Sequence, residues 1–152
     1  MGRFYVTQTV RYQKLDPRAV EPAYGSAAAA GADLYAVLDQ PLTLQPGQTT
    51  LVHTGLAVEI PEGYVGLIFA RSGLATKRGL APANKVGVID ADYRGEIMVA
   101  LHNHGSEAQT IEHGERVAQL ALLPFLTAAF QQADQLTDTV RGAGGFGSTG
   151  TK

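Results

Sequence analysis

A ten-residue segment near the C-terminus, 141–150, combines groups that can bind a nucleotide. It places Arg141, Phe146, Ser148 and Thr149 among five glycines. Glycine reaches positive φ at no steric cost, so such a segment can wrap its amides around an anion. Arginine offers a planar fork of donors to phosphate, and phenylalanine offers a flat face to a base. We predict a strap that closes over a nucleotide, although composition alone is typical of an unstructured chain end.

Further segments along the chain are more polar or richer in glycine than a plain β-sheet requires. In one, Arg71 and Ser72 stand where a short helix would begin, and free amides at such a point suit an anion. In another, Asp90 and Asp92 follow an apolar strand. Taken singly, each segment has an ordinary explanation as a turn, a helix cap or a solvated ion pair. The four segments are residues 30–34, 71–75, 87–96 and 114–119.

The elements that must position these groups are short apolar runs bounded by turn signals such as Gln-Pro-Gly at 45–47. Many short strands at close spacing predict an antiparallel sandwich, jelly roll or barrel. One helix is predicted at 72–78, capped by Ser72 and ended by Gly79. The predicted strands are residues 4–7, 48–53, 56–60, 65–70, 85–89, 96–102 and 117–124.

Bulk composition limits the class of protein. The 152 residues suit one domain, and 45% hydrophobic with 17% charged residues is typical of a folded chain. A polar stretch at 134–140 divides the predicted body, residues 1–133, from an arm, residues 134–152. A net charge of −2 argues against a broad nucleic-acid or membrane surface, and the chain has no cysteine for a disulfide or thiolate metal site. With no long apolar run, we expect a cytoplasmic protein.

In this order and spacing, the five segments resemble the five signature motifs of the trimeric dUTPase family, the deoxyuridine triphosphate nucleotidohydrolases. The likeness covers nearly the whole chain. It implies an all-β, distorted jelly-roll (β-clip) fold with one short helix and a flexible C-terminal arm. It also implies a homotrimer whose active sites lie at subunit boundaries, with the arm of one subunit closing over a neighbour's site. The implied reaction is Mg²⁺-assisted hydrolysis of dUTP to dUMP and pyrophosphate, which limits uracil incorporation into DNA and supplies dUMP for dTMP synthesis.

The resemblance also implies roles for individual residues. Asp90 would be the general base for water that attacks the α-phosphorus. Mg²⁺ would sit mainly on phosphate oxygens and waters, with Asp33 supporting it through water. Tyr93 would pack under the deoxyribose and leave no space for a ribose 2′-hydroxyl, while peptide groups around Asn84 would read uracil. The implied substrate-binding residues are Arg71, Ser72, Gly73, Asn84, Val86, Gly87, Tyr93, Met98, Gln119, Arg141, Phe146, Gly147, Ser148 and Thr149.

Two other functions are weighed against this one. A dCTP deaminase-like enzyme shares the fold and part of the third motif, but carries a catalytic glutamate in the following strand. The matching position here is Ala100, so a base for attack on cytosine is missing. The other alternative is a non-catalytic, dUTP-binding regulatory protein. The presence of Asp90 together with Arg71, Ser72 and Arg141 argues against it, because sensing alone needs no base facing the α-phosphorus.

Overall fold

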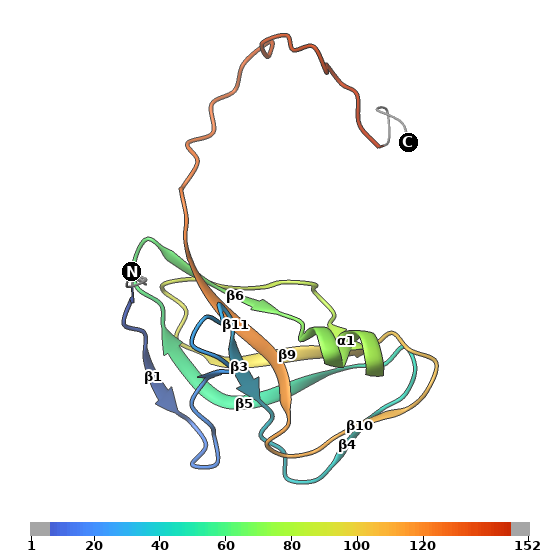
Figure 1. Ribbon diagram of the computed structural model, residues 1–152. Helices are drawn as coiled ribbons and strands as arrows, with labels where there is room; N and C mark the ends of the chain where they lie inside the picture. The colour runs from blue at the N-terminus through green and yellow to red at the C-terminus, as the bar shows by residue number, and fades with distance from the viewer. Residues whose placement is uncertain (1–6, 147–152) are drawn as a thin grey trace.

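Two β-sheets enclose the core of the protein (Figure 1). The computed structural model describes residues 7–146. One sheet has four strands in the order β1 (Arg11–Lys14), β5 (Thr49–Glu59), β9 (Glu96–Asn103) and β7 (Leu80–Pro82). The second has five strands in the order β2 (Ala23–Tyr24), β3 (Ala32–Tyr35), β11 (Arg116–Pro124), β6 (Tyr64–Phe69) and β8 (Gly87–Ile89). A two-stranded ribbon joins β10 (Gln109–Ile111) to β4 (Leu42–Leu44).

The strands in the middle of the chain alternate between the two large sheets. From β5 to β9 the chain passes from one sheet to the other at every step, and every neighbouring pair is antiparallel. This crossing pattern gives the jelly-roll-like β fold that the sequence predicted. Within residues 7–146, no helix is long and apolar enough to cross a membrane.

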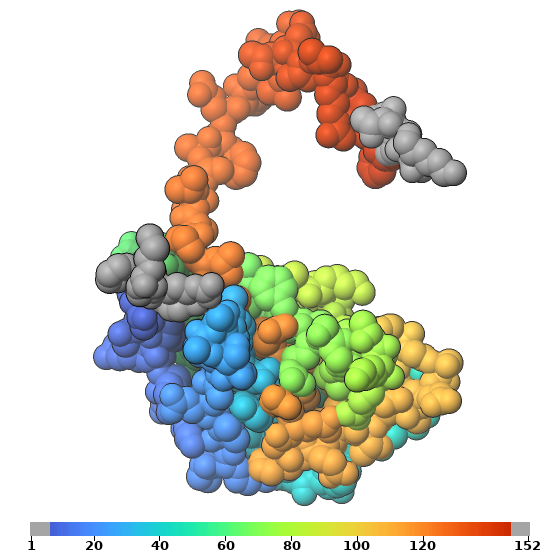
Figure 2. Space-filling model, in the orientation of Figure 1, coloured from blue at the N-terminus to red at the C-terminus, as the bar shows by residue number. Residues whose placement is uncertain are grey.

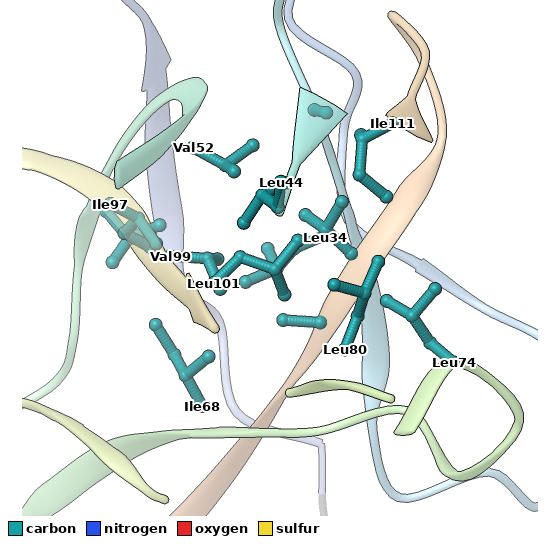
Figure 3. Close-up of a cluster of buried hydrophobic side chains, with 14 of the residues drawn as sticks. Leu34, Leu44, Val52, Ile68, Leu74, Leu80, Ile97, Val99, Leu101 and Ile111 are labelled. Carbon is teal, nitrogen blue, oxygen red and sulfur yellow. The ribbon is translucent and has the colours of Figure 1, made fainter. Parts of the chain in front are cut away.

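The core is built by side chains that alternate along the strands. In β9, Ile97, Val99 and Leu101 are buried, while Met98 between them is exposed. Period-two burial of this kind places one face of a strand on the core. Figure 3 shows the resulting cluster, to which both sheets and the helix contribute. Its largest fully buried aliphatic side chains are Leu34, Leu44, Ile60, Leu80, Ile97, Leu101, Ile111, Val52, Val99 and Val117.

The helix α1 (Ser72–Arg78) connects β6 to β7 and was predicted with these bounds. Leu74 anchors it in the core, and Gly79 ends it at φ 65° with its amide donating to the Leu74 carbonyl. The predicted cap is wrong, because Arg71 is the N-cap residue and no side chain caps the helix. Ser72 lies inside the first turn instead.

Other strands differ from the prediction in extent. The runs at 48–53 and 56–60 form one strand, β5, with a register shift between His53 and Ala57. Residues 4–6 of the first predicted strand lie outside the described residues, and Thr7 is not in a strand. Six short strands were not predicted: β1, β2, β3, β4, β7 and β10.

The chain leaves the body after β11. Residues 125–146 contain no helix or strand and run out as an extended C-terminal segment, which stands clear of the body in the space-filling view (Figures 1 and 2). Beyond Phe125, its large apolar side chains are almost fully exposed, including Leu126 at 97%, Phe130 at 98% and Leu136 at 89%. A segment this apolar is poorly suited to stand free in water.

Candidate active site

Three neighbouring strands bring parts of the first, second and fourth segments together. Asp33 on β3 pairs in register with Gln119 on β11, and Gln119 pairs with Phe69 on β6. The chain then reaches Arg71 and the first turn of α1 two residues after Phe69. Antiparallel pairing therefore gathers residues that are far apart in sequence at one end of the five-stranded sheet.

Asp33 holds two arginines at this end of the sheet. Its Oδ1 accepts a hydrogen bond from Arg71 Nε at 2.8 Å, and its Oδ2 lies 3.3 Å from Arg116 Nη1. Only 13% of the Asp33 side chain is exposed, against 28% for Arg71. Charge-assisted bonds at a partly buried carboxylate fix the direction of the guanidinium groups. One carboxylate and two guanidinium groups leave a net positive charge facing solvent.

Gln119 lies close beside this trio. Its Nε2 donates to the Ala70 carbonyl at 2.8 Å, directly before Arg71. A Cβ on Gly31 would lie 2.3 Å from Gln119 Oε1, so a side chain there would push the amide away. Gly31, the glycine of the first segment, is therefore required because Gln119 packs directly against it.

The hollow in front of these groups has a volume of about 550 Å³. Ser72 and Gly73 are exposed on its wall, and the Ser72 hydroxyl makes no hydrogen bond within residues 7–146. Three cations that the sequence analysis did not select also line it: Lys77, Arg78 and Arg116. Arg78 is already bound by Gln109, Glu115 and the Thr110 carbonyl. The sequence could have indicated Lys77, because it lies one helical turn after Gly73.

The third segment lies at the edges of both large sheets. The loop at 83–86 links β7, the edge of one sheet, to β8, the edge of the other. Asn84 and Val86 are exposed in this loop, while Gly87 is buried. Edge strands carry peptide groups without a ladder partner on one side, and such groups can recognise a flat polar ligand. Met98 is exposed on the neighbouring strand β9.

A turn after β8 carries Asp90 and Tyr93. The amide of Tyr93 donates to the Asp90 carbonyl at 3.2 Å, and the Tyr93 hydroxyl donates to the Glu96 carbonyl at 2.8 Å. A Cβ on Gly95 would lie 2.5 Å from the Tyr93 oxygen, so the phenol folds back against this glycine. Asp90 is exposed and lines a second hollow of about 1130 Å³.

The structure does not bring all predicted residues together in one chain. The hollow around Asp90 and the hollow around Arg71 share no lining residue among those described. On the arm, Arg141 Nε bonds only to the nearby Gly144 carbonyl among the described residues, and Phe146 is fully exposed. Gly147, Ser148 and Thr149 lie outside the described residues. The predicted site is therefore present as separate parts.

Comparison with known proteins identifies this combination of parts. The family model for dUTPase matches residues 18–150, which is most of the chain. The chain belongs to the dUTPase family. The deoxyuridine 5'-triphosphate nucleotidohydrolase of Desulfitobacterium hafniense is 54% identical over 142 residues, covering 93% of this chain and 94% of the relative. That of Hahella chejuensis is 50% identical over 132 residues, covering 86% and 87%.

Solved structures agree with the family assignment. A variant dUTPase of Staphylococcus bacteriophage 80alpha with dUpNHpp matches at a TM-score of 0.86 and 29% identity, covering 95% of this chain and all of the other. A variant dUTPase from phage phi11 of S. aureus, described for its coordination of a structural Mg(II) ion, matches at a TM-score of 0.75 and 27% identity, covering 84% and 98%. The jelly-roll-like fold is thus the fold of the dUTPase family.

The donor set for a metal is sparse. No group of three or more histidine and carboxylate side chains able to hold an ion occurs within residues 7–146. The carboxylates lining the Arg71 hollow are Asp33 and Glu115, and both are paired with arginines. Magnesium binds few protein ligands and keeps waters and phosphate oxygens. These residues fit an ion that arrives with a polyphosphate better than an ion held by the protein alone.

Proposed function

We propose that this member of the dUTPase family hydrolyses dUTP to dUMP and pyrophosphate. The observation that carries the proposal is the hollow that gathers Asp33, Arg71, Ser72 and Gln119, in a chain half identical to named deoxyuridine 5'-triphosphate nucleotidohydrolases. A basic hollow with an unused hydroxyl suits a triphosphate, because guanidinium and hydroxyl donors match phosphate oxygens.

Phosphate binding is assigned to the groups around α1. Arg71, held by Asp33, would direct its remaining N–H groups toward the outer phosphates. Ser72 would donate its free hydroxyl, Gly73 leaves space for close approach, and the second amide proton of Gln119 would reach the same oxygens. Mg²⁺ would be held by the triphosphate with Asp33 behind it, and when bound it neutralises phosphate charge during water attack. Donors placed where charge develops account for much of the acceleration of such reactions.

Base and sugar recognition are assigned to the third segment and the residues that flank it. The loop containing Asn84, Val86 and Gly87 would present its peptide groups to uracil. A cytosine edge has the opposite donor and acceptor pattern, so buried groups would remain unpaired at about 1–3 kcal/mol each. The Tyr93 ring, folded onto Gly95, would support the deoxyribose, and Met98 would contact the same nucleoside. Asp90, three residues before Tyr93, would take the proton from water attacking the α-phosphorus.

We also propose that the working enzyme is a homotrimer with shared sites. Two features support it: the separate hollows of Asp90 and Arg71, and the exposed apolar side chains in residues 125–146. A second copy would bring its Asp90 turn against the Arg71 hollow, and an arm would close over both. Arg141 would then meet phosphate, Phe146 would stack on the base, and Gly147, Ser148 and Thr149 would complete the strap. We keep the division predicted from the sequence, with 1–133 as the body and 134–152 as the closing arm, and residues 125–133 link the last strand, which ends at Pro124, to that arm.

The test is an assay with a panel of nucleotides. The purified protein is incubated with Mg²⁺ and dUTP, dCTP, dTTP or UTP, while pyrophosphate and ammonia are both measured. Pyrophosphate from dUTP, with much less from the other three, is the expected result. Ammonia from dCTP would indicate a deaminase instead, and tight dUTP binding without any product would indicate a regulatory protein.

A further inference from the structure

A register shift in β5 lies beside the turn that carries Tyr93. Between His53 and Ala57, β5 bulges away from β9, so three β5 residues stand opposite one residue of the partner strand. Gly55 adopts φ 66°, and a Cβ there would lie 3.0 Å from the Cβ atoms of both Ala19 and Asp16. A bulge interrupts the ladder and leaves backbone groups that need other partners.

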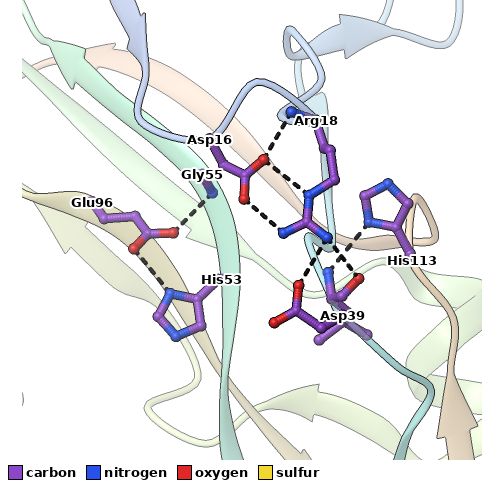
Figure 4. A network of polar contacts seen from close by, with 8 residues as sticks. Asp16, Arg18, Asp39, His53, Gly55, Glu96 and His113 are labelled. Carbon is purple, nitrogen blue, oxygen red and sulfur yellow. Dashed lines mark hydrogen bonds and ion pairs between the residues drawn. The ribbon is translucent and has the colours of Figure 1, made fainter.

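Glu96 supplies the missing partner through its side chain. Its Oε1 accepts from the Gly55 amide at 2.8 Å, and its Oε2 lies 2.9 Å from His53 Nδ1 (Figure 4). Only 22% of the Glu96 side chain is exposed, compared with 56% for His53. The Thr54 hydroxyl adds a further contact across the bulge by donating a hydrogen bond to the Ile97 carbonyl at 2.6 Å. The first residue of β9 is therefore fastened to β5 by a carboxylate with both oxygens engaged.

The backbone of the same residue holds Tyr93. The Glu96 carbonyl accepts the hydrogen bond from the Tyr93 hydroxyl at 2.8 Å, while the ring folds onto Gly95. The Glu96 side chain sets where β9 begins, and the Glu96 carbonyl sets where the phenol lies. Two independent contacts of one residue thus connect the β5 bulge to the predicted support of the sugar.

We propose that Glu96 is a positioning residue for Tyr93 and thereby contributes to discrimination between deoxyribose and ribose nucleotides. Glu96 does not itself reach the substrate in this proposal, which rests on the proposed function. Without its carboxylate, the Gly55 amide loses its acceptor, the start of β9 loosens, and the Tyr93 ring gains freedom to move. A ring that can move aside admits a 2′-hydroxyl that the fixed ring excludes.

The experiment compares Glu96→Met, which keeps length but removes both acceptors, with Glu96→Gln, which keeps an acceptor for the Gly55 amide. Glu107→Gln is the matched control, because Glu107 is exposed and its side chain makes no hydrogen bond within residues 7–146. The measured quantity is the ratio of kcat/KM for dUTP to that for UTP. We expect Glu96→Met to lower this ratio about three- to tenfold, as for the loss of one or two hydrogen bonds. Glu96→Gln and the control should stay near the unmodified protein.

Tyr93→Ala separates positioning from simple loosening of the fold. If Glu96 acts through Tyr93, then Glu96→Met should lower the ratio no further in a Tyr93→Ala background. Amide hydrogen exchange at Gly55 gives a readout that does not depend on turnover. Protection of the Gly55 amide should fall in Glu96→Met and stay unchanged in Glu96→Gln and Glu107→Gln.

Loss of Gly55 protection with an unchanged dUTP-to-UTP ratio would overturn the proposal and leave Glu96 a structural residue. Additive effects of Glu96→Met and Tyr93→Ala would overturn it as well. The ratio of affinities for dUpNHpp and its ribose counterpart tests Glu96 even in a protein that does not turn over dUTP. Failure of turnover in the unmodified protein would instead contradict the proposed function.

Discussion

Arg71 Nε and Asp33 Oδ1 lie 2.8 Å apart, joining the residue before helix α1 to the middle of strand β3. The pair is partly buried, and Asp33 also holds Arg116 at 3.3 Å. Removing the carboxylate would leave two guanidinium groups repelling one another in the same hollow. The orientation of Arg71 toward a phosphate thus depends on a residue from another segment.

Replacing the Asp33 carboxylate should make hydrolysis of dUTP less efficient. We expect Asp33→Asn to lower kcat/KM for dUTP at least about tenfold, because a hydrogen bond to a charged group contributes about 1.5–3 kcal/mol. Asp39→Asn is a suitable control, since Asp39 also pairs with an arginine but lies among a different set of residues. Steady-state kinetics of both variants checks this prediction. If kcat/KM for dUTP were the same in Asp33→Asn as in Asp39→Asn, Asp33 would not be part of the site.

Asp90 should matter for turnover and little for binding. We expect Asp90→Asn to bind dUTP with nearly unchanged affinity and to lose about 10²–10⁴ in kcat, the range for removal of a general base. Asp92→Asn, two residues away in the same hollow, is the matched control. Calorimetric titration and single-turnover kinetics separate the two quantities. A kcat close to that of the unmodified protein would show that another group takes the proton.

Removal of the strap should abolish most activity without unfolding the body. A chain ending at Val140 keeps every strand and the helix found within residues 7–146, since the last of these elements ends at Pro124. We therefore expect unchanged thermal stability and oligomeric state, with little dUTP hydrolysis. Phe146→Ala should show a milder loss, because stacking of an aromatic ring adds about 0.5–1.5 kcal/mol beyond the burial of its area. Full activity in the shortened chain would contradict a closing role for residues 141–152.

Acid stability should depend on Asp16. The side chain and amide of Arg18 donate to this carboxylate and lower its pKa from 3.8 to about 2 (Figure 4). A depressed pKa in the folded state stabilises the protein above pH 3.8, and this contribution is lost as the pH falls toward 2.

Asp16→Asn should therefore reduce the free energy of unfolding near neutral pH and flatten its decline between pH 4 and 2. Denaturant unfolding at a series of pH values measures both effects, with Asp138→Asn on the exposed arm as the control. An unchanged slope in Asp16→Asn would mean that the ion pair with Arg18 does not form in solution.

Sequence reasoning located the parts of the fold that rest on strong local signals. Helix α1 was predicted with its observed bounds because Gly79 ends it, although the cap predicted at Ser72 is wrong. The long strands β9 and β11 were found because they are continuous and rich in aliphatic residues. Short strands such as β2 were missed because two residues carry no periodicity. The bulge at Gly55 was read as a break between two strands, since its repair comes from Glu96, distant in sequence.

The sequence allowed individual site residues to be predicted, but not the contacts between them. The motifs selected Asp33 and Arg71, yet their ion pair depends on the pairing of β3 with β11 and β6. Arg116 was not selected as a site residue, because nothing in its local sequence places it 3.3 Å from Asp33. The separation of Asp90 from Arg71 is a property of the whole fold and required the structure.

Sharing of one active site by two copies is tested most directly by mixing two inactive variants. Asp90→Asn and Arg71→Gln are purified separately, unfolded together in equal amounts and refolded, and dUTP hydrolysis is measured. If Asp90 and Arg71 of each site come from different copies, about one quarter of the sites regain both residues, and activity returns to about a quarter of the unmodified level. If both residues of a site come from one chain, no site is restored, and an inactive mixture would contradict the shared site.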